Sequence, residues 1–254
     1  MRRTVAVALL AVLVLAGVAQ GERAQHGNLI VQLDGSFAPL TLPRDRKAPV
    51  SIHLEAGLTT ADHTVLPRVR GFELGIPGQG LITTRGLPVC TPQRLRNTTT
   101  EKALALCRPA LVGRGRMVAQ VKVPNQAAFM VHARLLAFNG RVHGRRAVIV
   151  HGISGSPPTV VALPFLIEHR AGKFGTALVA HLPRDLGPWP RFARFEINLS
   201  RRYSYQGRQL SYISASCPIP AQNTAGFFSF AKATFTLAHG RRVGIAIPRS
   251  CRAA

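Results

Sequence analysis

The chain has 254 residues, of which 46% are hydrophobic, so it is long enough to bury a sizeable core, and its composition argues against disorder. Lys and Arg number 33 against 10 Asp and Glu, which gives a formal net charge of +23. After residue 21 no apolar stretch is long enough to cross a bilayer, which excludes a transmembrane helix from the rest of the chain.

The excess of positive charge predicts attraction to polyanions such as nucleic acid, an anionic cell-envelope polymer or acidic lipid headgroups. A merely basic surface without a binding site is the alternative. The arginines are scattered, with adjacent pairs after residue 21 only at 145–146, 201–202 and 241–242. Arg also greatly outnumbers Lys, as a GC-rich genome encodes whatever the function.

The N-terminus has the residue order of a secretory signal peptide over residues 1–21. Arg2 and Arg3 precede an apolar run from Val5 to Ala16, and small residues follow. This order predicts cleavage near residues 19–21 and a secreted, extracellular protein. An uncleaved membrane anchor is the alternative, but the apolar run is shorter than the roughly 20 residues that span a bilayer.

Residues 22–89 are expected to form an N-terminal β unit behind a polar tail at 22–27. Strands are predicted at 28–33, 49–57 and 68–76, where apolar and polar residues alternate between turn residues.

Four cysteines, Cys90, Cys107, Cys217 and Cys251, indicate disulfides in an exported chain. Three pairings are possible, and we expect the nearest-neighbour one, Cys90–Cys107 with Cys217–Cys251. A zinc site is the alternative, but the sequence contains no Cys-x-x-Cys and no cluster of Cys and His at ligand spacing.

Residues 90–110 predict a helical insert bounded by the first disulfide. Thr91 and Pro92 are typical of a helix start. Residues 100–107 combine strong helix formers behind a threonine, and Pro109 ends the run.

Residues 111–254 are expected to form the main antiparallel β domain, with a single domain over 22–254 as the alternative. Asn139-Gly140 predicts a turn. Strands are predicted at 117–123, 129–137, 146–153, 159–168, 173–182, 191–199, 201–206, 208–216, 227–238 and 242–248.

A two-residue turn at Gln206-Gly207 predicts one hairpin in register. Pairing across this turn brings six side chains to one face: Tyr205 with Arg208, Tyr203 with Leu210, and Arg201 with Tyr212. An aromatic platform for sugars or bases is one interpretation. Ordinary cross-strand packing, with arginine stems over tyrosine rings, is the other.

Many strands with short connections and almost no helix predict an all-β fold. We expect an antiparallel β-sandwich or jelly-roll-like arrangement with a short disulfide-pinned helical insert, and a curved sheet or barrel as the alternative. A parallel sheet would need crossover helices, for which the chain has no room.

No motif indicates a catalytic site. The segment at 151–156 is similar to a nucleophile elbow, but Ser156 stands where the second glycine is required, and prolines follow instead of a helix. The acids within strands, Glu55, Glu73 and Glu196, are the candidates for a carboxylate pair. Neighbouring strands carry four histidines without metal-ligand spacing, namely His132, His151, His169 and His181. We therefore assign no catalytic, cofactor-binding or metal-ligating residue and expect no cofactor.

Several segments resemble a family of uncharacterised exported proteins from high-GC Gram-positive bacteria. The matching pieces cover about residues 86–252 and include Cys90 to Gly115, Leu135 to Gly140, Leu163-Pro164-Phe165, Phe174-Gly175-Thr176, and Arg202 to Pro218. The resemblance implies export and a pairing role for the four cysteines. It implies no activity, ligand or catalytic residue.

Three functional hypotheses follow. The first is a secreted, non-enzymatic β-rich protein that binds a ligand or associates with the cell envelope, in contact with anionic polymers. The second is a secreted hydrolase whose site is assembled from distant strands, which requires close acids or a Ser/His pair in a cleft. The third is a carrier of apolar ligands, which requires a large open cavity between the sheets.

Overall fold

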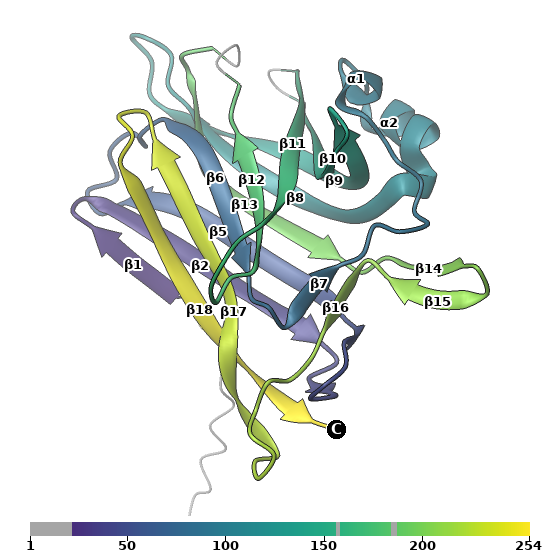
Figure 1. The fold of residues 1–254 in the computed structure, drawn as a ribbon. Coiled ribbons are helices and arrows are strands. Elements are labelled where there is room, and N and C mark those ends of the chain that lie inside the picture. Colours follow the sequence, from purple (N-terminus) through teal and green to yellow (C-terminus); the bar gives the residue numbers. More distant parts are fainter. Residues whose placement is uncertain (1–21, 156–157, 184–186) are drawn as a thin grey trace, which may run out of the picture.

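The computed structural model describes residues 22–155, 158–183 and 187–254, so the predicted signal peptide at 1–21 lies outside the described residues. A 13-stranded sheet dominates the fold and curls strongly on itself (Figure 1). Its strands, in spatial order, are β1 (Glu22–His26), β2 (Leu29–Ala38), β5 (Ser51–Thr60), β13 (Pro190–Leu199), β8 (Leu111–Val121), β9 (Phe129–Val142), β10 (Arg145–Ser154), β11 (Thr159–His169), β12 (Thr176–His181), β6 (Val69–Ile76), β17 (Ala225–Leu237), β18 (Arg242–Ala253) and β3 (Thr41–Leu42). Only the last pair, β18 with β3, is parallel.

Smaller elements complete the fold. A three-stranded sheet consists of β4 (Ala48–Pro49), β16 (Ile213–Ala215) and β7 (Gly80–Ile82), and β14 (Arg202–Tyr205) forms a hairpin with β15 (Arg208–Ser211). The helices are α1 (Pro92–Leu95) and α2 (Thr100–Cys107), followed by the 3-10 turn η1 (Arg108–Ala110). No helix within the described ranges is long and apolar enough to span a membrane.

The predicted all-β antiparallel fold with a short helical insert is confirmed, in the form of one large curled sheet. Strands from the N-terminal part of the chain lie among those from the C-terminal part. Strand β5 pairs with β13, and β6 lies between β12 and β17. Residues 22–89 and 111–254 therefore share one sheet and one core.

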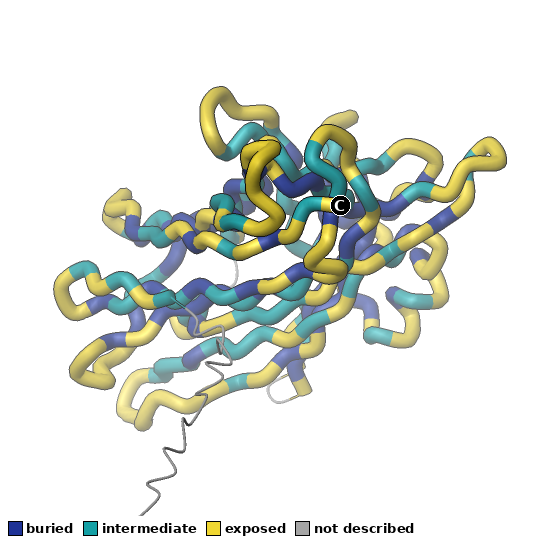
Figure 2. The backbone as a smooth tube through the Cα atoms, turned by 90° about the horizontal axis from the view of Figure 1, so that it is seen from below, coloured by how far each residue is buried: buried dark blue, intermediate teal, exposed yellow. Residues whose placement is uncertain are grey.

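The burial pattern follows from the two-residue period of a strand. Along β2, buried residues alternate with more exposed ones from Leu29 to Phe37, so one face of the strand enters the core. Figure 2 shows exposed residues gathered in the loops, while buried and intermediate ones run through the strands. Both predicted disulfides, Cys90–Cys107 and Cys217–Cys251, are present.

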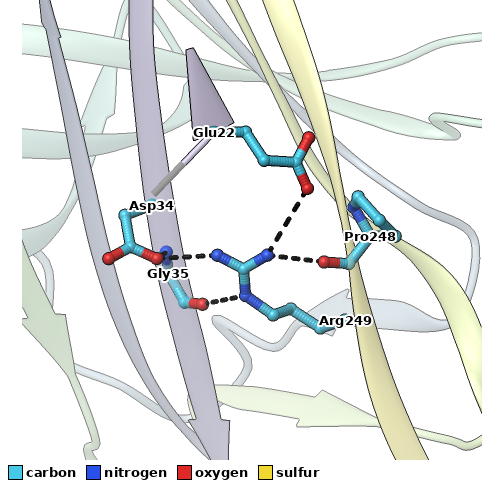
Figure 3. Close-up of polar contacts among 5 residues, drawn as sticks. All are labelled: Glu22, Asp34, Gly35, Pro248 and Arg249. Carbon is cyan, nitrogen blue, oxygen red and sulfur yellow. Dashed lines mark hydrogen bonds and ion pairs between the residues drawn. The ribbon is translucent and has the colours of Figure 1, made fainter. Parts of the chain in front are cut away.

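The curl brings the two ends of the sheet together along a seam between β18 and the pair β1–β2 (Figure 3). Here Arg249 of β18 donates to Asp34 Oδ1 at 2.6 Å and to the Gly35 carbonyl at 2.5 Å, both in β2. Glu22 of β1 lies 3.9 Å from the same guanidinium group. On the same seam, His26 Nε2 contacts the Gly244 carbonyl at 3.1 Å. Side-chain contacts therefore link strands that are not paired by backbone hydrogen bonds.

The helical insert covers the outer face of the sheet at β9, β10 and β11. Thr99 caps α2, since its hydroxyl accepts a hydrogen bond from the Lys102 amide at 3.2 Å. A second, smaller core forms beneath the insert, and its buried members include Cys90, Leu95, Phe138 and Ile149. The first disulfide thus ties a local cluster rather than the main core.

Two local predictions were wrong. The expected polar tail at 22–27 forms strand β1, because Gly27 adopts a positive φ of 69° and turns the chain so that β1 pairs with β2. Asn139-Gly140 lies inside β9, and the turn falls at His143 and Gly144, with φ of 48° and 77°. Gly140 is needed for close approach instead, since a Cβ there would lie 2.9 Å from the Cys90 carbonyl oxygen.

The predicted hairpin register is confirmed. Tyr205 pairs with Arg208 and Tyr203 with Leu210, and the Tyr212 amide donates to the Arg201 carbonyl at 2.8 Å. Tyr203 and Tyr212 are buried in the core, so two of the three aromatic rings serve packing rather than an exposed platform.

Candidate functional site

The curled sheet encloses an apolar cavity of about 340 Å³. This volume lies within the range of roughly 300–1,000 Å³ that is typical of small-molecule sites. Strands β5, β6, β8, β10, β11, β13 and β17 all contribute to the lining. The cavity therefore lies between the opposed halves of one sheet.

Alternation along the strands places the lining residues. On β10 and β11 the cross-strand pairs Val148–Phe165, Val150–Leu163 and Gly152–Val161 all face the cavity. On β6, Phe72, Leu74 and Ile76 do the same. Many of these apolar side chains remain only partly buried, because they face this space instead of other side chains.

An aromatic cluster forms one wall of the cavity. The Phe72 ring lies 5.0 Å from the Phe235 ring, 5.2 Å from Phe195 and 6.1 Å from Phe165 between centroids. Phe192 joins the cluster because an irregularity in β13 between Phe192 and Arg194 shifts the side-chain period. Both Phe192 and Phe195 can then face inward, although strict alternation would put them on opposite faces.

One end of the cavity is closed. Ile82 of β7, Tyr212 and Ile213 of β16 line this end, and all three are buried. Burial raises the pKa of the Tyr212 phenol far above its ordinary value, so the side chain stays neutral. Its hydroxyl has no hydrogen-bond partner among the described residues.

The other end reaches solvent and carries positive charge. Arg68, Arg70 and Arg191 line the cavity there, together with Pro183 and Pro190, and of these Arg70 and the two prolines are exposed. We call this end the arginine mouth. Apart from these arginines and Tyr212, the described lining is apolar.

The described lining offers few polar side chains. It contains no carboxylate, imidazole or thiol and no serine or threonine hydroxyl. A hydrolase needs an acid pair or an activated nucleophile, and the lining supplies neither among these residues.

The three strand acids singled out in the sequence lie on the outer face of the sheet. Glu55 and Glu196 are direct cross-strand partners, so the structure does bring two carboxylates together. Each is held by an arginine: Glu196 by Arg116 at 2.6 Å and Glu55 by Arg194 at 3.3 Å. Glu73, on β6, pairs in the same way with Arg242 at 3.2 Å. These contacts are surface ion pairs on the face of the sheet opposite the cavity lining.

The four strand histidines do not converge. His132 and His181 are exposed on β9 and β12, and His169 contacts Arg146 at 3.0 Å. His151 is fully buried beneath the helical insert, where its Nε2 lies 3.0 Å from the Thr98 carbonyl oxygen. Within the described ranges, no group of three or more His, Cys, Asp or Glu residues could hold a metal ion.

His151 should make the stability of the protein depend on pH. Burial lowers its pKa below the ordinary 6.5, and the contact with Thr98 opposes this only in part. Below pH 6.5 the unfolded chain takes up a proton that the folded protein resists, so stability falls as the pH falls. Between pH 7 and pH 5 the free energy of unfolding of the wild type should fall. In His151→Gln we expect this fall to be about 1 kcal/mol smaller, as measured by urea denaturation at both pH values. His132→Gln, at an exposed position, should follow the wild type, and equal losses in all three proteins would contradict the assignment.

The segment that is similar to a nucleophile elbow occupies the end of β10. His151 and Gly152 lie within the strand, which ends at Ser154, and Ser156 lies outside the described residues. Gly152 faces the cavity.

The basic residues are spread over the molecule. Six arginines pair with carboxylates among the described residues, namely Arg116, Arg145, Arg170, Arg194, Arg242 and Arg249. A second groove, beside β7 and β9, is lined in part by Arg85, Arg141 and Arg146.

No protein-family model matches the chain, and no curated protein or solved structure is significantly similar to it. The family resemblance noted in the sequence therefore stays a prediction.

Sequence reasoning did not identify the lining residues as a site. The alternation did predict which residues share a face, such as Phe195, Ile197 and Leu199, and all three line the cavity. The sequence carries no signal that the space between opposed faces stays open. Arg68 and Arg191 could have been noticed only as charges at the ends of apolar strands.

Proposed function

We propose that this protein binds an apolar molecule inside its curled sheet, as a carrier or binding protein rather than an enzyme. The single observation that carries the proposal is the apolar cavity of about 340 Å³, closed at Tyr212 and reached by solvent at the arginine mouth. Of the three functional hypotheses, this is the one that required such a cavity.

The energetics favour an apolar occupant. Burying one methylene group contributes about 0.8 kcal/mol. The binding cost in translational and rotational freedom, about 4–15 kcal/mol, is therefore met by a chain of about 5 to 19 carbons. Phe165, Phe192 and Phe195 are only partly buried, so they can gain contacts when a ligand enters.

The two disulfides support a location outside the cytosol, because such bonds persist in oxidising compartments. Secretion through a signal peptide at 1–21 agrees with this. Contact with an anionic cell-envelope polymer is not needed for ligand binding and stays a prediction from composition. The groove beside Arg85, Arg141 and Arg146 is where we would place it.

The test introduces a bulky side chain that occupies the cavity. Val150 lies in the middle of one wall, opposite Leu163. We expect the wild type to bind the neutral probe N-phenyl-1-naphthylamine saturably, with enhanced fluorescence. Val150→Trp should weaken this binding at least tenfold, since the indole occupies space that the aromatic rings of the probe would otherwise fill and removes part of their buried apolar area.

The matched control is Thr59→Trp, which adds the same side chain at an exposed position of β5. It should bind the probe like the wild type. If Val150→Trp does not fold, as judged by circular dichroism, Leu163→Phe is a smaller filling change at the same level of the wall. Undiminished probe binding by a folded, filled variant would place the probe outside the cavity and overturn the proposal.

A further inference from the structure

Two of the three guanidinium groups at the arginine mouth, those of Arg68 and Arg191, come from distant parts of the chain. Arg68 directly precedes β6, and Arg191 lies near the start of β13. Gln120 of β8 brings them together: it is the cross-strand partner of Arg191, and its side-chain oxygen accepts a hydrogen bond from the Leu66 amide at 2.8 Å. The segment that carries Arg68 is therefore fixed beside Arg191.

Both groups are also held by one loop. Arg68 Nη2 donates to the Gly187 carbonyl at 3.0 Å, and Arg191 Nη1 donates to the Pro188 carbonyl at 2.5 Å. A guanidinium group has five N–H donors. In the described structure, the remaining nitrogens of both groups have no hydrogen-bond partner, and no carboxylate lies within ion-pair distance of either.

Two like charges that line one cavity mouth and bond neighbouring carbonyls of one loop repel each other. Partial burial, and then the charge of Arg68, lower the pKa of the Arg191 guanidinium group. Both groups nevertheless stay protonated at neutral pH, because the pKa of arginine starts above 12. An anion between them would relieve the repulsion and use the free donors, for which the planar fork of arginine is well suited.

We propose that the cavity takes an amphiphile with a single apolar chain and an anionic oxygen headgroup, with the chain among the phenylalanines and the head between Arg68 and Arg191. This inference rests on the proposed function. The volume of about 340 Å³, near the lower end of the range for small-molecule sites, favours one chain over two. A carboxylate and a phosphate monoester share the required chemistry.

The experiment compares four probes with the same sixteen-carbon chain for their ability to displace N-phenyl-1-naphthylamine, each below its solubility limit or micelle concentration. Hexadecanoate and hexadecyl phosphate carry the two anionic heads, hexadecanol is neutral, and hexadecyltrimethylammonium is cationic. At least one anionic probe should bind between about tenfold and hundredfold more tightly than hexadecanol, as charge-assisted hydrogen bonds predict. The cation should bind most weakly. The tighter of the two anions identifies the head.

The double variant Arg68→Gln/Arg191→Gln should abolish the preference for anions, so that the anionic probes bind this variant no more tightly than hexadecanol binds it. Arg114→Gln removes an exposed arginine of β8 that does not line the cavity, and it should keep the preference. Equal binding of the anions and hexadecanol by the wild type would overturn the head site while the apolar cavity still stands. A preference for anions that survives the double substitution would also overturn the head site. Failure of both the neutral probe and all four amphiphiles to bind would overturn the proposed function itself.

Discussion

Replacing Cys217 and Cys251 together with alanine is expected to lower the free energy of unfolding by about 4 kcal/mol, the largest loss that we predict for this protein. The disulfide closes a loop of 34 residues that contains β17. Cross-linking restricts the unfolded chain, and for a loop of this length the restriction contributes about 3.8 kcal/mol. Both sulfurs also lie in the main core, so packing is lost as well.

Cys90→Ala/Cys107→Ala is the matched comparison, since it also removes two sulfurs but opens a loop of 17 residues. We expect it to cost about 3 kcal/mol and to loosen mainly the helical insert, because its sulfurs belong to the smaller core. Urea denaturation under non-reducing conditions measures both. A larger loss for the Cys90–Cys107 pair would show that the insert, rather than the β17–β18 region, limits stability.

Arg249→Met should cost about 2 kcal/mol, because it removes charge-assisted hydrogen bonds that join the two ends of the sheet, while the Asp34 carboxylate, 38% exposed, can still be hydrated. The side chain is only 14% exposed and bonds both the Asp34 carboxylate and the Gly35 carbonyl. Methionine keeps an apolar stem of similar length but removes the guanidinium donor from both acceptors of β2, and among the described residues Asp34 Oδ1 then accepts only from the Gly35 amide, at 2.6 Å. Arg249→Lys should recover only part of the loss, since one ammonium group cannot reproduce the planar fork.

The control is Arg242→Met on the same strand. Arg242 is 59% exposed and pairs with Glu73 at 3.2 Å, so its loss should cost at most about 1 kcal/mol. Denaturation curves of the two variants measure the difference directly. Equal costs at the two positions would mean that the seam depends on backbone packing rather than on the Arg249 contacts.

The seam also bears on ligand binding. Strand β17 lines the cavity through Phe230, Ala231 and Phe235, and its neighbour β18 holds the seam closed. A variant that loosens the seam should therefore weaken probe binding in addition to lowering stability. Filling the cavity with Val150→Trp should weaken probe binding while the seam contacts stay intact. The two kinds of variant separate the stability of the curled sheet from its capacity to bind.

The strands and the cysteines were predictable because their signals are local. Alternation in 50–55 and 195–199 reports which residues share a face, and the physical cause is the two-residue period of the strand itself. The nearest-neighbour pairing of the cysteines is likewise the one observed. The tail at 22–27 was missed because its residues are polar, although Gly27-Asn28 is a recognised hairpin turn signal.

At Asn139-Gly140 the error is the opposite one, since a turn was predicted where the structure has a strand. The dipeptide is a strong turn signal, yet both residues lie in β9. Asn139 is buried there and donates to the Pro88 carbonyl at 2.9 Å, and Gly140 lies against Cys90. Contacts with a segment some fifty residues earlier in the chain outweigh the local turn preference, which single-residue propensities do not include.

By itself, the sequence predicted most of the extended segments and the place of the helical insert, because neighbours in the chain carry that information, and of three possible cysteine pairings the expected one is observed. Only the tertiary structure decided that β5 pairs with β13 and β6 with β17, that Arg249 joins the two ends of the sheet, and that Arg68 meets Arg191 at an open end. The physical reason is that alternation assigns a side chain to a face without fixing how far away the opposite face lies. Whether apolar faces meet or leave a cavity depends on the curl of the whole sheet.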